Sequence, residues 1–239
     1  MAAPKLKVLE CDYGTLSPKQ VTVLLKAFKT NSTLNTFCLT GNRIRDDGTK
    51  ALFKALKINS TLTTLIVKNC DVAIDGVKAL SEALKINSAL ATLDLEGNDV
   101  KCEGAKALSE ALRINSTLTT LVLQQCGIET EGVKALSEAL KTNSTLTTLD
   151  LSSNLIEDDG ARMLANTLKI NSTLTTLNLD WVGMYEEGLM ALAETLKVNS
   201  TLTTLGLTNN NIASNYDESQ CGLVFDDPRL VIYDENQIY

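Results

Sequence analysis

The chain has no histidine, few aromatic residues and no closely paired cysteines, and each absence excludes a class of function. Without histidine, the chain cannot build a Ser-His-Asp or Cys-His catalytic arrangement, or a histidine metal site. Its six cysteines occur singly, with no Cys-x-x-Cys spacing. This pattern argues against a zinc cluster and favours reduced thiols in a cytoplasmic protein. We therefore expect no catalytic residues, no metal and no cofactor.

Long apolar stretches are also missing. No apolar run approaches the roughly 18 residues that a membrane span requires, and the first residues lack the apolar segment of a secretion signal. The net charge of -7 and the pI near 4.8 disfavour binding to nucleic acid or to an anionic membrane through bulk charge. A basic protein is the partner that this charge favours.

What the chain does have is a period of 28 residues. Glycines keep this spacing from Gly48 to Gly188. An Asn-Ser pair recurs with the same spacing, and its asparagines are Asn31, Asn59, Asn87, Asn115, Asn143, Asn171 and Asn199. A fixed period of this length indicates stacked units that contact only their neighbours. We therefore predict one elongated domain over residues 1–239, a shape that favours binding a large partner.

Within one unit, a strand-like segment precedes a helix-like segment. Residues 62–67 place Leu, Ile and Val at strand spacing, and Val77, Leu80 and Leu84 share one face of a helix. The recurrent Asn after the helix tolerates a left-handed conformation, and a left-handed residue at this place can stop the helix. Most copies read Asn-Ser-Thr, and without a secretion signal we interpret them as turns, not glycosylation sites.

The strand and the loop after it follow the pattern L-x-x-L-x-L-x-x-N/C-x-I/V, and this pattern resembles the leucine-rich repeat. The Asn or Cys column reads Asn42, Cys70, Asn98, Cys126, Asn154, Val182 and Asn210. This alternation resembles the ribonuclease-inhibitor-like subclass, and residues 143–161 resemble repeats of the nucleotide-binding, leucine-rich-repeat (NLR) immune receptors. The resemblance implies an α/β solenoid, or horseshoe, of 28-residue β-α units. Its parallel sheet would line the concave face and its helices the convex face.

The turn at Val182 and the two ends of the chain depart from the regular repeat. Val182 cannot donate a hydrogen bond, so we expect a looser or water-filled turn there. Residues 1–30 are read as a divergent first repeat, 31–212 as regular repeats and 213–239 as an irregular cap. Because Leu230 and Tyr233 fall 28 residues after Leu202 and Leu205, a terminal strand is predicted near 229–234.

The candidate binding site follows from the same resemblance, which implies that outward strand positions line the concave face. Two of the outward columns vary between repeats and include an acidic stripe with few cations, next to the single tryptophan. Carboxylates near an exposed aromatic suit a basic protein partner. The predicted partner-binding residues are Asp94, Glu96, Gln124, Asp150, Asn178, Asp180 and Trp181. The alternative is that the charges are merely solvated and that Trp181 packs against Val182 or Tyr185.

These observations favour a non-catalytic module that binds a protein partner through an acidic concave face. One alternative is a GTPase-activating protein of the Ran GTPase activator type, in which Arg43 and Arg45 of a rim loop would act on the GTPase. The structural interpretation of these arginines is that they balance Asp46 and Asp47. A further alternative is a ligand-sensing repeat region of an immune-type receptor.

Overall fold

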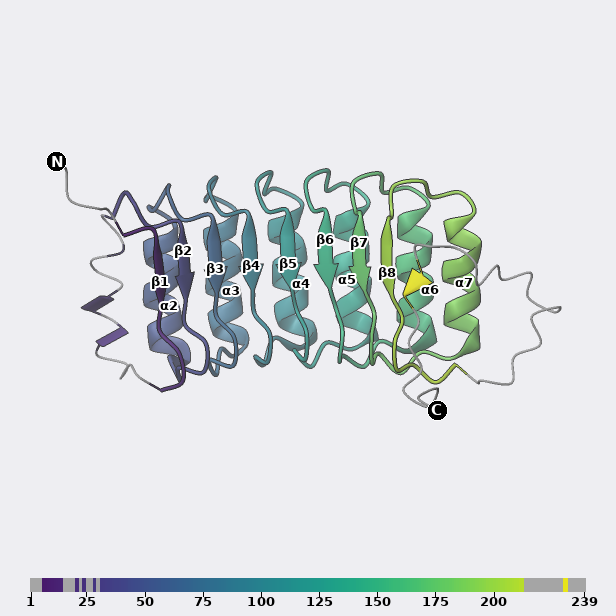
Figure 1. Cartoon of the computed structure of the whole chain (residues 1–239), viewed down its shortest axis with the longest axis horizontal. Helices are drawn as coiled ribbons and strands as arrows, with labels where there is room; N and C mark the ends of the chain where they lie inside the picture. Colours follow the sequence, from purple (N-terminus) through teal and green to yellow (C-terminus); the bar gives the residue numbers. More distant parts are fainter. Residues whose placement is uncertain are drawn as a thin grey trace.

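The computed structural model describes residues 6–14, 20–21, 23–24, 28, 31–212 and 230–231. In these residues the strands form one parallel sheet, and the helices lie in a single layer behind it (Figure 1). The nine strands follow chain order in the sheet. Each repeat therefore lies beside the next repeat in the sequence. The predicted α/β leucine-rich-repeat solenoid is confirmed.

Each repeat contributes a short strand and, in most repeats, a longer helix. The strands are β1 (Val8–Glu10), β2 (Thr36–Cys38), β3 (Thr64–Ile66), β4 (Thr92–Asp94), β5 (Thr120–Val122), β6 (Thr148–Asp150), β7 (Thr176–Asn178), β8 (Thr204–Gly206) and β9 (Leu230–Val231). The helices are α2 (Arg45–Leu56), α3 (Ile74–Leu84), α4 (Lys101–Leu112), α5 (Thr130–Leu140), α6 (Glu157–Leu168) and α7 (Glu186–Leu196). From β1 to β8, residues 28 positions apart lie opposite each other, as Thr92 lies opposite Thr120.

The last strand breaks this register. Strand β9 lies within the range predicted for it, but Leu230 pairs with Leu205, an offset of 25 residues (230 minus 205). The 28-residue spacing from which this strand was predicted is therefore not the spacing at which it pairs. The intervening sequence is polar and lacks the helix pattern, so nothing in it imposes the regular period. The remaining residues of the proposed cap lie outside the described residues, and the domain boundaries stay a prediction.

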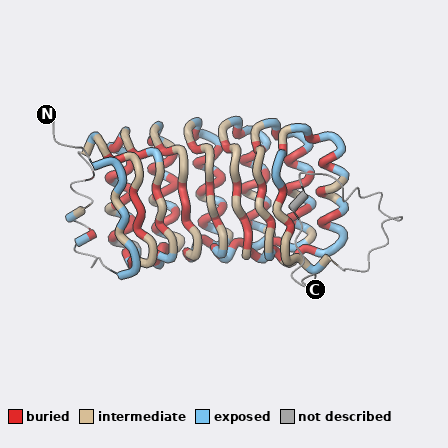
Figure 2. The backbone as a smooth tube through the Cα atoms, in the orientation of Figure 1, coloured by how far each residue is buried: buried red, intermediate tan, exposed pale blue. Residues whose placement is uncertain are grey.

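The core is a continuous aliphatic layer between the strands and the helices (Figure 2). The central strand leucines, such as Leu93 and Leu121, are completely buried, and so are Leu80, Leu108 and Leu136 of the helices. Neighbouring helices approach closely at the recurrent glycine. A Cβ at Gly76 would lie 2.7 Å from Thr49 Cγ2 of the preceding helix, so this column keeps the helix layer tightly packed.

The recurrent asparagines form a ladder of hydrogen bonds that joins each repeat to the one before it. Asn115 Oδ1 accepts the N–H groups of Thr117 (3.0 Å) and Leu118 (2.8 Å), which closes its own turn. Asn115 Nδ2 donates to the carbonyl oxygens of Leu84 (2.8 Å) and Asn87 (3.1 Å) in the preceding repeat. The bond to the carbonyl 31 residues earlier recurs at Asn59, Asn87, Asn143, Asn171 and Asn199.

This ladder explains why the Asn-Ser pairs are architectural. From Asn59 to Asn199 the asparagines are only 4–7% exposed, and their amide groups already have partners. None of them has a positive φ, so the expected left-handed helix stop is wrong. The helix ends because the Asn side chain captures the next turn, a role that needs no unusual backbone.

We expect Asn115→Ala to lower the free energy of unfolding by about 2–3 kcal/mol, because it leaves buried N–H and C=O groups without partners. Urea unfolding followed by circular dichroism measures the change. The adjacent exposed Ser116 provides a matched control, since Ser116→Ala should stay within about 0.5 kcal/mol of wild type. Equal effects of the two substitutions would contradict the ladder.

Leu149, at the centre of β6, is 1% exposed. Leu149→Ala should cost about 2–5 kcal/mol, because it opens a cavity in the shared core. Thermal unfolding should show a clear fall in the melting temperature. Exposed Ile170 is the control, and Ile170→Ala should barely move it. A shift for Leu149→Ala as small as that of the control would show that the core has been misplaced.

Candidate protein-interaction surface

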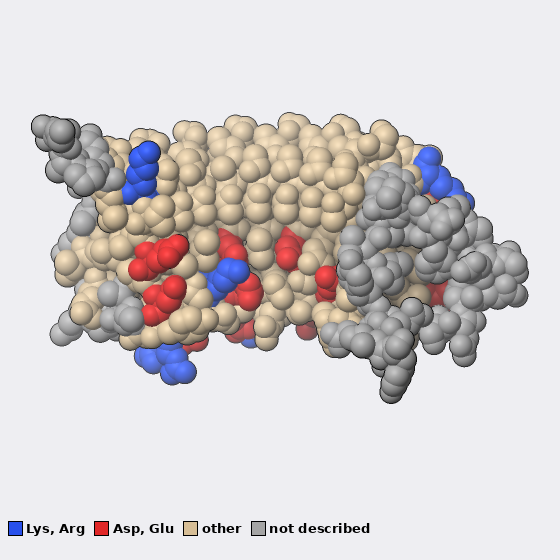
Figure 3. Space-filling model, in the orientation of Figure 1, with Lys and Arg blue, Asp and Glu red and all other residues tan. Residues whose placement is uncertain are grey.

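The outward side chains of the parallel strands form one broad surface, which we call the strand face. Strand register places Asp94, Val122, Asp150 and Asn178 side by side along it. Figure 3 shows acidic side chains running across this face. Glu10 and Asp12 at β1 extend the outward acidic columns and are exposed. They were not among the predicted site residues, although they belong to the same columns.

One part of the acidic stripe is neutralised from within. Lys68 Nζ lies 3.0 Å from Asp94 Oδ2 and 2.7 Å from Glu96 Oε2. Burial raises the pKa of Asp94, more than the Glu96 N–H and Lys68 lower it. Partial burial lowers the pKa of the Lys68 ammonium, but its hydrogen bonds to Glu96 and Asp94 raise this pKa, and the net change is upward. The stripe has few cations, but one of them, Lys68 of the preceding repeat, already pairs with these two carboxylates.

The carboxylates of Asp150 and Asp180 differ from those of Asp94 and Glu96, because they form no ion pair among the described residues. Asp150 Oδ1 accepts the N–H and Oγ–H of Ser152, at 2.9 and 2.6 Å. Asp180 Oδ1 accepts the N–H of Thr208 at 2.7 Å. Asn178 lies between them: its Nδ2 donates to Asp150 Oδ2 at 3.4 Å, and its Oδ1 accepts the Asp180 N–H at 2.9 Å. These neutral donors fix both carboxylates, and no cation among the described residues compensates their charge.

The other predicted residues are spread over several repeats of the strand face. Gln124 is half-buried in the column between Glu96 and Ser152, and its carbonyl accepts the Gly97 N–H at 3.0 Å. Trp181 follows Asp180 and is 57% exposed. The structure thus brings Asp150, Asn178, Asp180 and Trp181 together at the ends of β6 and β7. Asp94 and Glu96 form a separate cluster with Lys68.

Trp181 occupies a column in which every described repeat has a left-handed backbone. The residues with positive φ in this column are Tyr13, Gly41, Asn69, Gly97, Gln125, Ser153, Trp181 and Asn209. The turn from the strand into the loop requires this conformation, which favours Gly and Asn over bulky residues. The mixture of Gly, Asn, Gln and Ser at a fixed spacing was the signal in the sequence that could have revealed it.

The turn at Val182 is not loose. Val182 is completely buried, and its N–H donates to Asn210 Oδ1 of the next repeat at 3.1 Å. Ile156 and Glu157 of the preceding repeat donate their N–H groups to the Val182 carbonyl. Asn or Cys in this column donates to the carbonyl 31 residues earlier, which here is the Leu151 carbonyl. Asn154 Nδ2 donates to that carbonyl at 2.9 Å and valine fills the volume, so the expected looser turn is wrong.

The arginines proposed for a GTPase-activating role lie at the start of α2 and in the loop before it. Arg43 Nε is 3.7 Å from Asp71 Oδ2 in the next repeat, and both side chains are exposed. Arg45 is the first residue of α2 and has a φ of 51°. The expected partners, Asp46 and Asp47, have side chains outside the described part of the chain. Arg43 is thus tied to its neighbour by a weak surface ion pair.

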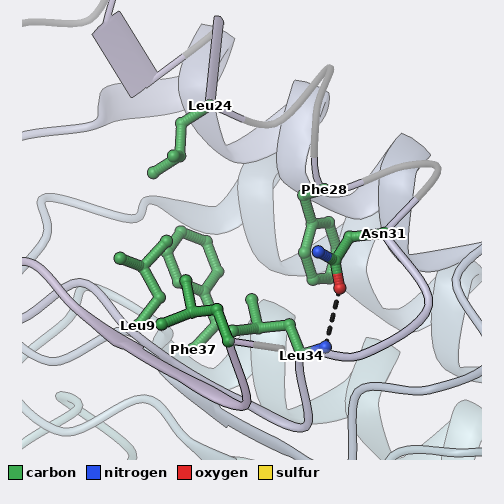
Figure 4. Close-up of a pocket in the computed structure, with 7 residues that line it drawn as sticks. Leu9, Leu24, Phe28, Asn31, Leu34 and Phe37 are labelled. Carbon is green, nitrogen blue, oxygen red and sulfur yellow. Dashed lines mark hydrogen bonds between the residues drawn. The ribbon is translucent and has the colours of Figure 1, made fainter. Parts of the chain in front are cut away.

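An apolar pocket of about 140 Å³ lies at the N-terminal end of the core (Figure 4). Its lining is Leu6, Leu9, Leu24, Phe28, Asn31, Leu34 and Phe37. Phe28 and Phe37 stack with ring centroids 5.6 Å apart. The lining contains no titratable side chain, so the pocket extends the core and offers no acid-base chemistry.

The described residues offer neither a metal site nor a membrane-spanning helix. They contain no group of three or more Cys, Asp or Glu arranged to hold a metal ion. None of the described helices is both long enough and apolar enough to cross a membrane.

Comparisons with known proteins agree with this architecture. A family model described as "Leucine Rich repeat" matches residues 30–53, 59–81, 87–109, 115–137 and 142–165. The solved structure titled "Leiomodin-1 Actin-Binding Site 2 (ABS2)" is similar, with a TM-score of 0.52 and 25% sequence identity. The match covers 62% of this chain and 86% of that one. No curated protein sequence matches the chain.

The chain is a leucine-rich-repeat solenoid, and its repeats and structural neighbour indicate a protein-interaction module. Altogether 132 solved chains match the structure. A fold shared this widely does not identify a partner, because function depends on the side chains that it carries. The partner must therefore be argued from the surface.

The buried thiols give a pH prediction. Cys70 Sγ donates to the Leu39 carbonyl and Cys126 Sγ to the Leu95 carbonyl, and burial raises the pKa of both thiols to about 12. Unfolded thiols lose their protons near pH 9.0. Their contribution to stability is therefore complete below pH 9 and lost as the pH rises towards 12.

The double variant Cys70→Val/Cys126→Val should lose less stability over this range than wild type, because valine has no thiol to ionise. Valine fits the site, since it already fills the same column at position 182. The urea midpoint measured at increasing pH tests this. Cys102→Ala is the control, since Cys102 is only half-buried in α4, and its curve should parallel wild type. Parallel curves for all three proteins would contradict the claim that ionisation of the Cys70 and Cys126 thiols destabilises the fold at high pH.

Proposed function

We propose that the chain is a non-catalytic module that binds a basic segment of a protein partner along its strand face. The observation that carries the proposal is the pair Asp150 and Asp180, which are oriented by neutral donors and have no described counterion. A basic segment would supply the missing positive charge. Complementary charge of this kind increases the association rate and selects among partners.

The geometry of the strand face supports an extended occupant. Neighbouring strands are about 4.8 Å apart, so Asp150 and Asn178 on β6 and β7 present adjacent polar groups, with Asp180 just beyond them. The Lys68 cluster continues the same surface towards the N-terminal repeats. A partner segment that crosses the strands from β7 towards β5 would pass the carboxylates of Asp180 and Asp150 and then polar side chains such as Gln124.

The ribonuclease-inhibitor-like subclass is part of the proposal, and the alternation of the repeats supports it. Repeats with Asn in the loop column carry 12-residue helices, as in α4 and α6. Repeats with Cys or Val there carry 11-residue helices, as in α5 and α7. The resemblance to NLR repeats, and with it a ligand-sensing role, rests on the sequence alone.

Two specific partners follow from the likenesses. Actin is one, because the similar leiomodin-1 structure is titled an actin-binding site. A small GTPase is the other, through Arg43 and Arg45. We favour simple binding over GTPase activation, because Arg43 already pairs with Asp71.

Affinity capture from the source cell tests the proposal. The double variant Asp150→Asn/Asp180→Asn keeps an oxygen that can accept the Ser152 and Thr208 hydrogen bonds but removes both charges. We expect it to recover at least about tenfold less of the specific partner, as removal of charge complementarity predicts. Raising the salt concentration should weaken capture by the wild type.

A matched control removes two charges elsewhere. Glu103→Gln/Glu131→Gln changes exposed residues at the starts of α4 and α5 and should leave capture intact. Added purified actin and small GTPases, with GTP hydrolysis followed in the latter case, identify those two partners directly. Equal capture by wild type and the Asp150/Asp180 variant would overturn the acidic strand face.

A further inference from the structure

Three large apolar side chains stand exposed in the loops that follow β6 and β7. Leu155, Trp181 and Tyr185 are 57%, 57% and 56% exposed. We call these three residues the rim patch. Isolated exposed apolar residues are common on proteins, but a cluster of them often marks a binding surface.

The repeat shows what these positions normally hold. The column of Leu155 otherwise contains Arg43, Asp71, Asp99, Gly127, Gly183 and Asn211. The column of Tyr185 contains Arg45, Ala73, Lys101, Glu129 and Glu157. Apart from Tyr13, the column of Trp181 contains small or polar residues. Three departures from the period thus fall in two adjacent loops.

Another exposed apolar column contrasts with the rim patch. Ile58, Ile86, Ile114, Ile170 and Val198 stand exposed just beyond the helix ends. This column recurs in nearly every unit, so it is a property of the repeat itself. The rim patch is confined to one place, as expected of a site that recognises a particular partner.

The backbone makes Trp181 a costly choice for stability. Its φ is 56°, a left-handed value that is unfavourable for a bulky side chain and comfortable for Gly or Asn. The side chain remains largely exposed, so little burial compensates for this conformation. A tryptophan held in such a position is better explained by binding than by folding.

The contacts around the patch show that its loops lie together. The N–H groups of Ile156 and Glu157 donate to the Val182 carbonyl. A Cβ at Gly183 would lie 3.8 Å from Leu155 Cδ1. Tyr185 N–H donates to Asp158 Oδ1 at 2.9 Å. The absence of a side chain at Gly183 leaves space between Leu155 and the chain that carries Trp181 and Tyr185.

Carboxylates flank this patch on two sides. Asp150 and Asp180 lie towards the strand face, and the exposed Glu157 and Glu186 begin α6 and α7. Arg162 is the nearby cation on α6, but it already pairs with Asp159 and Glu187. An apolar surface between two acidic margins is complementary to an apolar side chain between basic ones.

We propose that the rim patch anchors a partner segment in which apolar residues alternate with Lys or Arg. The apolar side chains would cover Leu155 and Tyr185, and a guanidinium or ammonium would lie over the indole of Trp181, next to Asp180. The inference rests on the proposed function, because it names the kind of basic segment that the strand face accepts and adds an apolar anchor beside it.

Synthetic peptides and the full chain test this inference. The first peptide, Gly-Ser-Arg-Leu-Lys-Leu-Arg-Ser-Gly, is basic and apolar. The second replaces both Leu by Ser, and the third replaces the Arg and Lys residues by Ser. Fluorescence anisotropy of labelled peptides gives the Kd values. Unlabelled peptides are titrated while the emission of the single tryptophan is followed, since this emission reports on Trp181 alone.

We expect the first peptide to bind at least about tenfold more tightly than either of the others and to shift the tryptophan emission, because both halves of the site contribute. Trp181→Asn should abolish this advantage while leaving the melting temperature unchanged or higher, since Asn suits the left-handed backbone. Gln125→Asn, in the same column two repeats earlier, is the control and should bind like wild type.

The possible failures are distinct. If the first two peptides bind equally and Trp181→Asn changes neither, the apolar anchor is overturned. If the Asp150→Asn/Asp180→Asn variant then fails to bind either of these two peptides, the acidic strand face is still supported. If the third peptide binds as tightly as the first, the basic part of this inference is overturned. An absence of binding and of any emission change overturns the rim patch, whereas the proposed function is judged by partner capture.

Discussion

The structure depends on one hydrogen-bonding arrangement, the asparagine ladder between repeats. A side chain such as Asn143 closes its own turn through Oδ1 and reaches the Leu112 carbonyl of the preceding repeat through Nδ2. Because both ends of this bridge are fixed by the backbone, an insertion or deletion within a unit would displace one of them. The ladder therefore explains why the 28-residue period is so strictly kept.

A strict period also makes the exceptions informative. Positions that hold the framework repeat from unit to unit, whereas positions that face solvent are free to change. Trp181 is an exception that stability does not explain, because its column requires a left-handed backbone. Leu155 and Tyr185 depart from the pattern in the adjacent loops. Asp150 and Asp180, which have no counterion among the described residues, lie beside them, so the apolar departures coincide with two free carboxylate charges at one end of β6 and β7.

The sequence predicted the architecture well because periodicity and burial are local, repeated signals. The core position of Leu149 followed directly from its column. Pairings between neighbouring columns were harder to predict: the ion pair of Lys68 with Asp94 depends on side-chain reach across strands, which the period does not specify. Val182 was misjudged because Asn154 of the preceding repeat already donates to the Leu151 carbonyl, which a donor at position 182 would otherwise serve. The partner-binding role of the predicted residues stays a prediction.

The central claim is that a partner binds where the exceptions cluster, at the ends of β6 and β7. Amide hydrogen exchange of the full chain, measured with and without the captured partner, tests it most directly. The account predicts that the partner slows exchange in the loops at residues 151–157 and 179–186 and leaves the turns beyond the helix ends unchanged. Slower exchange confined to those helix-end turns, around Ile86 and Ile114, would contradict it.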